Sequence, residues 1–118
     1  MENSAKIAAV HRYVEAFDKA DMEIIRELYA RDAVVEDPVG TEPHVGLDAI
    51  CAFYEGALAS GAKLVLTGTP RCAGNAVAFP FEARMPGMRM QIIDVFEFNE
   101  AGKISQMRAY WDNDNMIS

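Results

Sequence analysis

One aspartate lies on the apolar face of a predicted strand, and this position suggests a chemical role for its carboxyl group. Residues 88–98 alternate at period two, and one face carries Asp94 among large apolar side chains. Its neighbours on that face are Met88, Met90, Ile92, Phe96 and Phe98. An ionised carboxylate there is costly, so Asp94 should be neutral or paired. Since a neutral carboxylic acid donates a hydrogen bond, the pattern predicts a buried donor. A mid-strand aspartate exposed at an edge or bulge is the alternative.

Three tyrosines form the second candidate group. Tyr13, Tyr29 and Tyr54 each fall on the apolar stripe of a different predicted helix. Buried hydroxyls tend to satisfy one another, so three tyrosines on packed helices predict a hydrogen-bonded network. The alternative is three separate core tyrosines, each with a partner of its own.

Asp37 is a third candidate, and the pattern around it has two interpretations. Asp37-Pro38-Val39-Gly40 has the composition of a type I turn. Asp37 is therefore either a turn former or a general base, and spacing alone does not decide. His11 and His44 are predicted to be surface residues, and no metal-ligand spacing or nucleophilic triad is present, so no metal site is predicted.

Two kinds of periodicity organise the chain around these residues. Helical spacing predicts helices over 4–19, 22–30 and 47–60, with Asn3 or Ser4 capping the first and Asp21 the second. After Gly61 the period changes to two, which predicts strands over 63–67, 77–85, 88–98 and 103–111. Pro80 cannot donate to a ladder, so it predicts an edge position or a bulge.

This order of elements predicts an α+β fold in a single domain, residues 1–118. We expect three N-terminal helices packed on a curved, mostly antiparallel sheet that forms a cone-shaped pocket. Large apolar side chains interspersed with polar groups favour a pocket over a solid core.

Composition excludes several classes of partner. The net charge is −7 without a basic cluster, which argues against nucleic acid and anionic membrane surfaces. No apolar run approaches the roughly 20 residues that span a bilayer. The first residues lack the pattern of a signal peptide. Cys51 and Cys72 are expected to be reduced structural thiols, so we expect a cytoplasmic protein.

Several segments together resemble a known family. They are His-Arg-Tyr-Val-Glu-Ala at 11–16, Leu-Tyr-Ala-Arg-Asp-Ala-Val-Val-Glu-Asp-Pro-Val-Gly at 28–40, Ala-Phe-Tyr at 52–54, Ile-Asp-Val-Phe-Glu-Phe at 93–98 and Met-Arg-Ala-Tyr-Trp at 107–111. In this order and spacing they resemble the bacterial Δ5-3-ketosteroid isomerases, homodimeric enzymes of the nuclear-transport-factor-two-like superfamily.

The resemblance implies a role for each candidate residue. Asp37 would be the general base, and Tyr13 and Asp94 would form the oxyanion hole. A neutral aspartic acid in that position is a known feature of this family. Tyr54 and Tyr29 would support Tyr13. The residues that line the steroid pocket would include Phe81, Met107 and Trp111.

The implied activity is a cofactor-free allylic isomerisation. A 3-oxo-Δ5-steroid would lose a C4 proton, pass through a dienolate and regain the proton at C6 as a 3-oxo-Δ4-steroid. The resemblance also implies a homodimer. Two alternatives remain open on the same fold: a polyketide cyclase-like enzyme, and a non-catalytic carrier of a steroid or another flat lipid.

Overall fold

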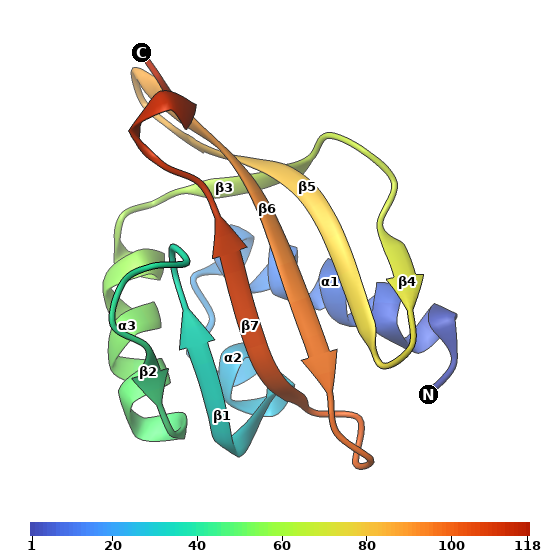
Figure 1. Ribbon diagram of the computed structural model, residues 1–118. Coiled ribbons are helices and arrows are strands. Elements are labelled where there is room, and N and C mark those ends of the chain that lie inside the picture. The colour runs from blue at the N-terminus through green and yellow to red at the C-terminus, as the bar shows by residue number, and fades with distance from the viewer.

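Three helices cover one face of a curved sheet in the computed structural model, which describes residues 1–118 (Figure 1). The helices are α1 (Asn3–Lys19), α2 (Met22–Leu28) and α3 (Leu47–Ala59). The strands are β1 (Tyr29–Glu36), β2 (His44–Val45), β3 (Lys63–Leu66), β4 (Arg71–Ala73), β5 (Ala76–Met85), β6 (Met88–Phe98), β7 (Ile104–Tyr110) and β8 (Met116–Ile117). A short 3-10 helix, η1 (Asn113–Asn115), precedes β8.

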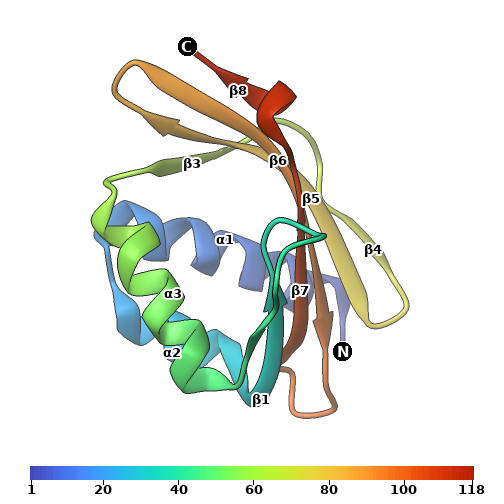
Figure 2. The same cartoon turned by 60° about the vertical axis from the view of Figure 1, so that its left-hand side comes forward.

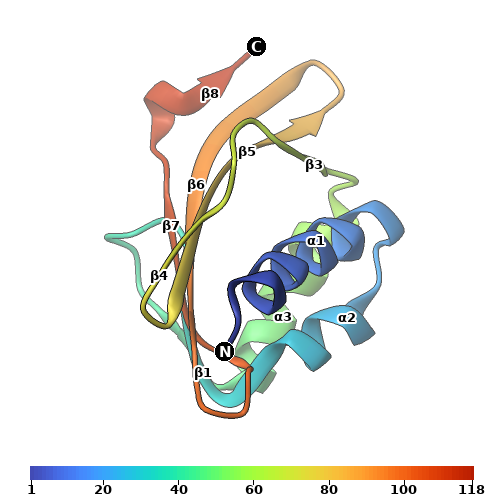
Figure 3. The same cartoon turned by 90° about the vertical axis from the view of Figure 1, so that its right-hand side faces the viewer.

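The sheet is mixed, mostly antiparallel and open. Its order is β2-β1-β7-β6-β5-β3, with β4 also pairing with β5 and β8 with β6. Only β1 and β7 run parallel. Figures 2 and 3 show the sheet bending around the helices, with the β5–β6 hairpin reaching beyond them. The predicted α+β architecture is therefore confirmed.

Apolar stripes on the helices explain the packing. Val10, Tyr13 and Phe17 on α1 are buried, as are Ile50 and Tyr54 on α3. Tyr13 of α1 meets the apolar face of β5 and β6, where Phe79 and Phe96 are fully buried, whereas α3 packs on β1 and β2. Burial of this surface stabilises the two layers against each other at roughly 25 cal/mol per Å² of apolar area.

The prediction that Asn3 or Ser4 caps the first helix is wrong. Glu2 is the N-cap of α1 and makes no side-chain capping bond. Asn3 Oδ1 instead accepts a hydrogen bond from Lys6 Nζ at 3.4 Å. The predicted Asp21 cap of α2 is confirmed, since its side chain accepts from Glu23 N at 2.9 Å.

Lys6 is buried, which the apolar stripe did not predict. It is 3% exposed, and its Nζ donates to the Gly74 carbonyl at 2.5 Å. This bond fastens α1 to the turn between β4 and β5. We expect Lys6→Ala to lower the free energy of unfolding by about 2 kcal/mol, because a charge-assisted bond is lost. Urea unfolding measures this effect, and the exposed Lys19→Ala is the control; equal midpoints for the two variants would contradict it.

The second helix is shorter than predicted. It ends at Leu28, and Tyr29 begins β1 instead of ending the helix. Tyr29 pairs with Ile104 of β7. Pairing with a distant strand thus overrides the helical spacing that joins Tyr29 to Ile25.

The turn after β1 also differs from the prediction of a type I turn over 37–40. Thr41 N donates to the Pro38 carbonyl at 3.1 Å, so the turn covers 38–41. Gly40 has φ of +99° at its third position, a conformation that suits a type II turn and favours glycine. Asp37 thus precedes the turn and is not its first residue.

Pro80 lies on an interior strand without a bulge, yet it occupies a local edge of β5, between the residues that pair with β3 and those that pair with β4. The β5–β6 register runs through Pro80 without a shift. On the other side of β5, β3 pairs with residues 81–84 and β4 with 76–78. The missing N–H of Pro80 therefore falls where neither strand pairs. Gly68 approaches its ring so closely that an added Cβ would lie 2.9 Å from Pro80 Cγ.

The other predicted turns, at 74–75, 86–87 and 99–102, separate paired strands as expected. Cys51 and Cys72 form no disulfide. None of the helices combines the length and apolarity needed to cross a bilayer.

Candidate active site

A cavity lies between the helices and the sheet. Its volume is about 230 Å³, where one water needs only about 15 Å³, so it exceeds a packing defect. Most of its lining is apolar, and the acidic side chains among its residues are Asp37 and Asp94. No group of three or more His, Cys, Asp or Glu side chains lies together as a metal site would require.

Asp94 is a buried polar residue in the lining of this cavity. It is 1% exposed, and its partners on the adjacent strands are Phe79 and Ala109. Neither carboxyl oxygen has a hydrogen-bond partner in the protein. Burial, and then the charge of Asp37, raise the pKa of Asp94 well above its ordinary value of 3.8. The predicted burial is confirmed, and the carboxyl group is suited to donate a hydrogen bond to a ligand.

The three tyrosines form one hydrogen-bonded chain, as the network interpretation predicted. The hydroxyl of Tyr54 lies 2.6 Å from that of Tyr29 and 3.0 Å from that of Tyr13. These two hydrogen bonds use the protons of two of the three hydroxyl groups. If each hydroxyl donates from Tyr29 through Tyr54 toward Tyr13, the proton of Tyr13 is left for a ligand. Burial raises the pKa of all three hydroxyls well above 10.0, so they stay protonated at neutral pH.

Asp37 is held at the end of β1 by a tryptophan. Its Oδ1 accepts a hydrogen bond from Trp111 Nε1 at 2.8 Å. The parallel pairing of Glu36 with Arg108 brings the ends of β1 and β7 together and places the two residues side by side. Burial raises the pKa of Asp37, while the Trp111 bond and the nearby His44 oppose this rise. A partly desolvated carboxylate with one oxygen bound is suited to act as a base.

Phe81 and Trp111 line the cavity, whereas Met107 does not. Met107 is fully buried and pairs with Phe96 and Val35 in the sheet. Tyr29 lies behind Tyr54 and outside the lining.

Sequence reasoning missed several lining residues: Phe17, Phe53, Ala57, Ser60, Ala62, Leu64, Ala83, Met85, Met90 and Ile92. Met90 and Ile92 share the strand face of Asp94, so period two could have identified them. His44 was predicted at the surface, but it is partly buried and its ring lies 4.5 Å from that of Phe53. The pattern around His44 carries no signal of this contact.

Asp94 should make stability depend on pH. Its pKa is raised in the folded protein above the value of about 3.9 in an unfolded chain. Its contribution to stability is therefore fully present below pH 4 and is lost as pH rises toward the folded pKa. We expect Asp94→Asn to gain stability relative to wild type between pH 4 and 7, as measured by urea midpoints. A constant difference between the two proteins would contradict a raised pKa.

The geometry suits proton transfer next to an oxygen atom that is held by hydrogen-bond donors. Asp37 can accept a proton, and Tyr13 and Asp94 can donate hydrogen bonds to an oxygen in the same apolar cavity. Fixed donors in a dry site stabilise developing negative charge without reorganising. The arrangement can therefore remove a proton from a carbon near a carbonyl group and hold the resulting enolate oxygen.

Comparison with known proteins gives a consistent result. The profile of the SnoaL-like domain matches residues 10–107. A steroid Δ-isomerase from Nocardioides simplex is 41% identical over 116 residues, which cover 93% of this chain and 92% of the relative. Epoxide hydrolase LasB from Streptomyces lasalocidi is 34% identical over 109 residues, which cover 84% of this chain but only 38% of LasB.

A solved structure has the same fold. SalBIII, an epoxide hydrolase/cyclase-like enzyme of pyran ring formation in salinomycin, superposes with a TM-score of 0.90 at 23% identity. The match covers 98% of this chain and 96% of SalBIII. At this identity it establishes the fold alone. With the profile match and the 41% identical relative, the chain belongs to the SnoaL-like, nuclear-transport-factor-two-like family and is a homologue of steroid Δ-isomerase.

Proposed function

We propose that the protein isomerises 3-oxo-Δ5-steroids to 3-oxo-Δ4-steroids. The observation that carries the proposal is the unpartnered, buried carboxyl group of Asp94 in a cavity that also contains Tyr13 and Asp37. Buried polar atoms without partners are rare, and a ligand oxygen would satisfy this one. The 41% identical steroid Δ-isomerase supports the same reaction.

In the proposed reaction, the steroid ketone lies against Tyr13 and Asp94. Asp37 removes the C4 proton, and the electron pair moves toward the ketone oxygen to give a dienolate. Each fixed donor stabilises this oxygen by on the order of 3 kcal/mol in the transition state. Asp37 then returns the proton to C6, which gives the conjugated enone and restores the base.

The apolar lining has two roles in this reaction. It holds the rings of the steroid by burial of apolar surface. It also disfavours charge on Asp94, which keeps the acid neutral and able to donate. Both roles depend on the exclusion of water.

Ultraviolet absorbance of the conjugated enone tests the proposal. We expect purified protein to accelerate enone formation from a Δ5-3-ketosteroid far beyond the buffer rate. Steroid binding without enone formation would indicate a carrier instead. Absence of both would indicate another substrate for the same site.

Removal of one hydroxyl from the tyrosine chain should have a small effect on activity. Tyr54→Phe removes the hydroxyl that bonds to Tyr13 and Tyr29. Tyr13 then donates more weakly, and we expect kcat to fall about fivefold, equivalent to one hydrogen bond of about 1 kcal/mol, with KM little changed. Steady-state enone kinetics measure both constants. A rise in KM with unchanged kcat would indicate that the three tyrosines shape the cavity and do not support Tyr13 as a donor.

Epoxide opening is the second candidate, because LasB is 34% identical. The same donors would bond to the epoxide oxygen, and Asp37 would activate a water or hydroxyl nucleophile. Assays with a lipophilic epoxide, followed by diol or cyclic ether formation, separate this activity from isomerisation.

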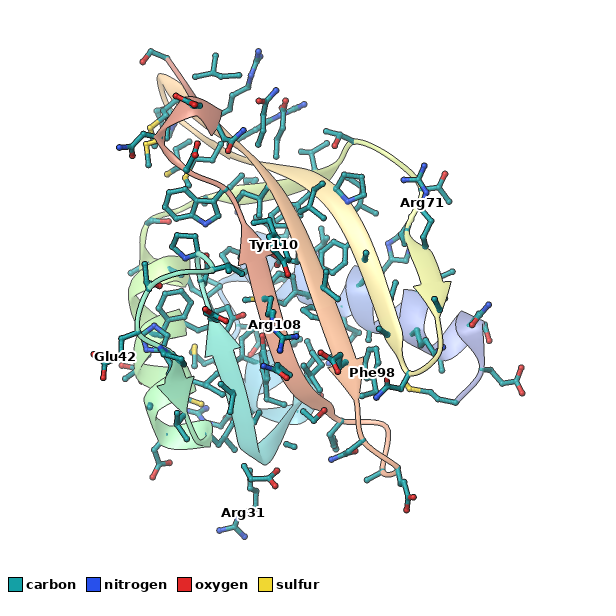
Figure 4. The ribbon with its side chains drawn as sticks, in the orientation of Figure 1. Arg31, Glu42, Arg71, Phe98, Arg108 and Tyr110 are labelled. Carbon is teal, nitrogen blue, oxygen red and sulfur yellow. The ribbon has the colours of Figure 1, made fainter.

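The homodimer implied by the resemblance stays a prediction. Ile93 and Tyr110 pair across β6 and β7 and are each 48% exposed. Figure 4 shows Tyr110 and Arg108 over β7 on the face of the sheet turned away from the helices. We expect this exposed face to form the dimer interface. Sedimentation equilibrium should then give twice the chain mass for wild type and a lower mass for Tyr110→Lys.

A further inference from the structure

The cavity has a closed end and an open end, and three elements carry its lining from one to the other. On β6 the lining runs from Asp94 to Ile92 and Met90, and on β5 from Phe81 to Met85. Asp94 and Phe81 are buried, whereas Met90 and Met85 are partly exposed. Met90 lies four positions before Asp94 on β6, a span of about 14 Å at about 3.4 Å per residue. The cavity is therefore elongated, with Asp94 at its closed end.

The third element is α3, whose C-cap residue, Ser60, brings a hydroxyl group to the open end. Phe53, Ala57 and Ser60 line the cavity at helical spacing, and exposure rises from Phe53 to Ser60. In Figure 2, the end of α3 that leads to β3 lies at the same end of the molecule as the β5–β6 hairpin. Apart from Asp37 and Asp94, Ser60 is the one lining residue that is neither aliphatic, aromatic nor a methionine.

The hydrogen bonds of Ser60 leave one lone pair of its hydroxyl oxygen free. Its Oγ donates its only proton to the Ala57 carbonyl at 2.6 Å. The same oxygen accepts from Ala62 N at 3.3 Å. A hydroxyl has one proton and two lone pairs, so a single lone pair remains. Toward the cavity, Ser60 is an acceptor and not a donor.

We propose that Ser60 selects substrates that carry a hydrogen-bond donor at the end remote from the reacting ketone. This inference rests on the proposed function for the orientation of the ligand. With the ketone at Asp94, the far ring of a steroid lies toward Ser60. A hydroxyl group there can donate to Ser60 Oγ, whereas a ketone cannot. A 17β-hydroxy steroid is therefore preferred over its 17-oxo counterpart.

Equilibrium binding tests this preference without requiring turnover. Trp111 is the only tryptophan and lines the cavity, so its fluorescence reports binding. The probes are two 3-oxo-Δ4-steroids, one with a 17β-hydroxyl and one with a 17-ketone. We expect the ratio of their dissociation constants to favour the hydroxyl in wild type, and to change by roughly threefold to tenfold in Ser60→Ala.

Two control variants separate this effect from a change in folding. Ser60→Thr keeps an acceptor oxygen and should retain the ratio. Ser105→Ala makes the same substitution at a serine outside the cavity, whose hydroxyl donates to the Glu97 carbonyl at 3.1 Å, and should also retain it. An unchanged ratio in Ser60→Ala would overturn the inference, and so would failure of wild type to bind either probe. A Ser60-dependent ratio in a protein that forms no enone would instead refute the isomerase and leave the selectivity.

Discussion

Asp37→Asn should lose about 10²- to 10⁴-fold in kcat for enone formation, the contribution of a positioned general base. The substitution removes the base and little else. Asparagine keeps a carbonyl oxygen that can accept the hydrogen bond of Trp111 Nε1, so the end of the cavity should keep its shape. We therefore expect steroid binding, measured by Trp111 fluorescence, to survive the loss of turnover.

Asp32→Asn is the matched control for this variant. Asp32 is exposed on β1, five residues before Asp37, which directly follows this strand, and its replacement makes the same change of charge. It should retain wild-type kcat. Wild-type kcat in Asp37→Asn would exclude Asp37 as the base, and equal losses in both variants would indicate a general effect of charge.

Asp94→Ala should lower kcat by about 10²- to 10³-fold, with a smaller change in KM, because a donor that acts mainly in the transition state is removed. Asp94→Asn should lose less, since its amide N–H can still donate to the ketone oxygen. The order wild type, Asn, Ala is the signature of a donor. Steady-state enone kinetics of the three proteins measure it.

The stability of these variants distinguishes a donor from a structural residue. Asp94 makes no hydrogen bond within the protein, so its replacement breaks none. Both variants should therefore unfold at urea midpoints equal to or above that of wild type at neutral pH. Marked destabilisation of Asp94→Asn would show that Asp94 is a structural residue and contradict its role as a donor.

Local periodicity predicts the part of this site that lies on regular elements. Period two placed Asp94 on the buried face of β6, and helical spacing placed Tyr13 and Tyr54 inside. Tyr29 was also predicted to be buried, although it begins a strand and not a helix end. In each case the residues before and after the candidate define the face on which it lies.

Asp37 could not be identified in this way, because its position depends on contacts between distant segments. It precedes a turn, and its neighbour Trp111 comes from the other end of the chain through the parallel pairing of β1 and β7. Only the family resemblance indicated its role. Met107 shows the converse limit: it has the residue type of a pocket side chain, but the sheet buries it away from the cavity lining.

In the proposed reaction one carboxylate carries a proton from C4 to C6, and isotopic labelling tests this transfer most directly. A Δ5-3-ketosteroid labelled with deuterium at C4 would be converted in ordinary water and the product analysed by NMR. We expect deuterium at C6 well above natural abundance, because Asp37 is largely shielded from solvent. Enone formation with no deuterium at C6 would contradict transfer by a single shielded base.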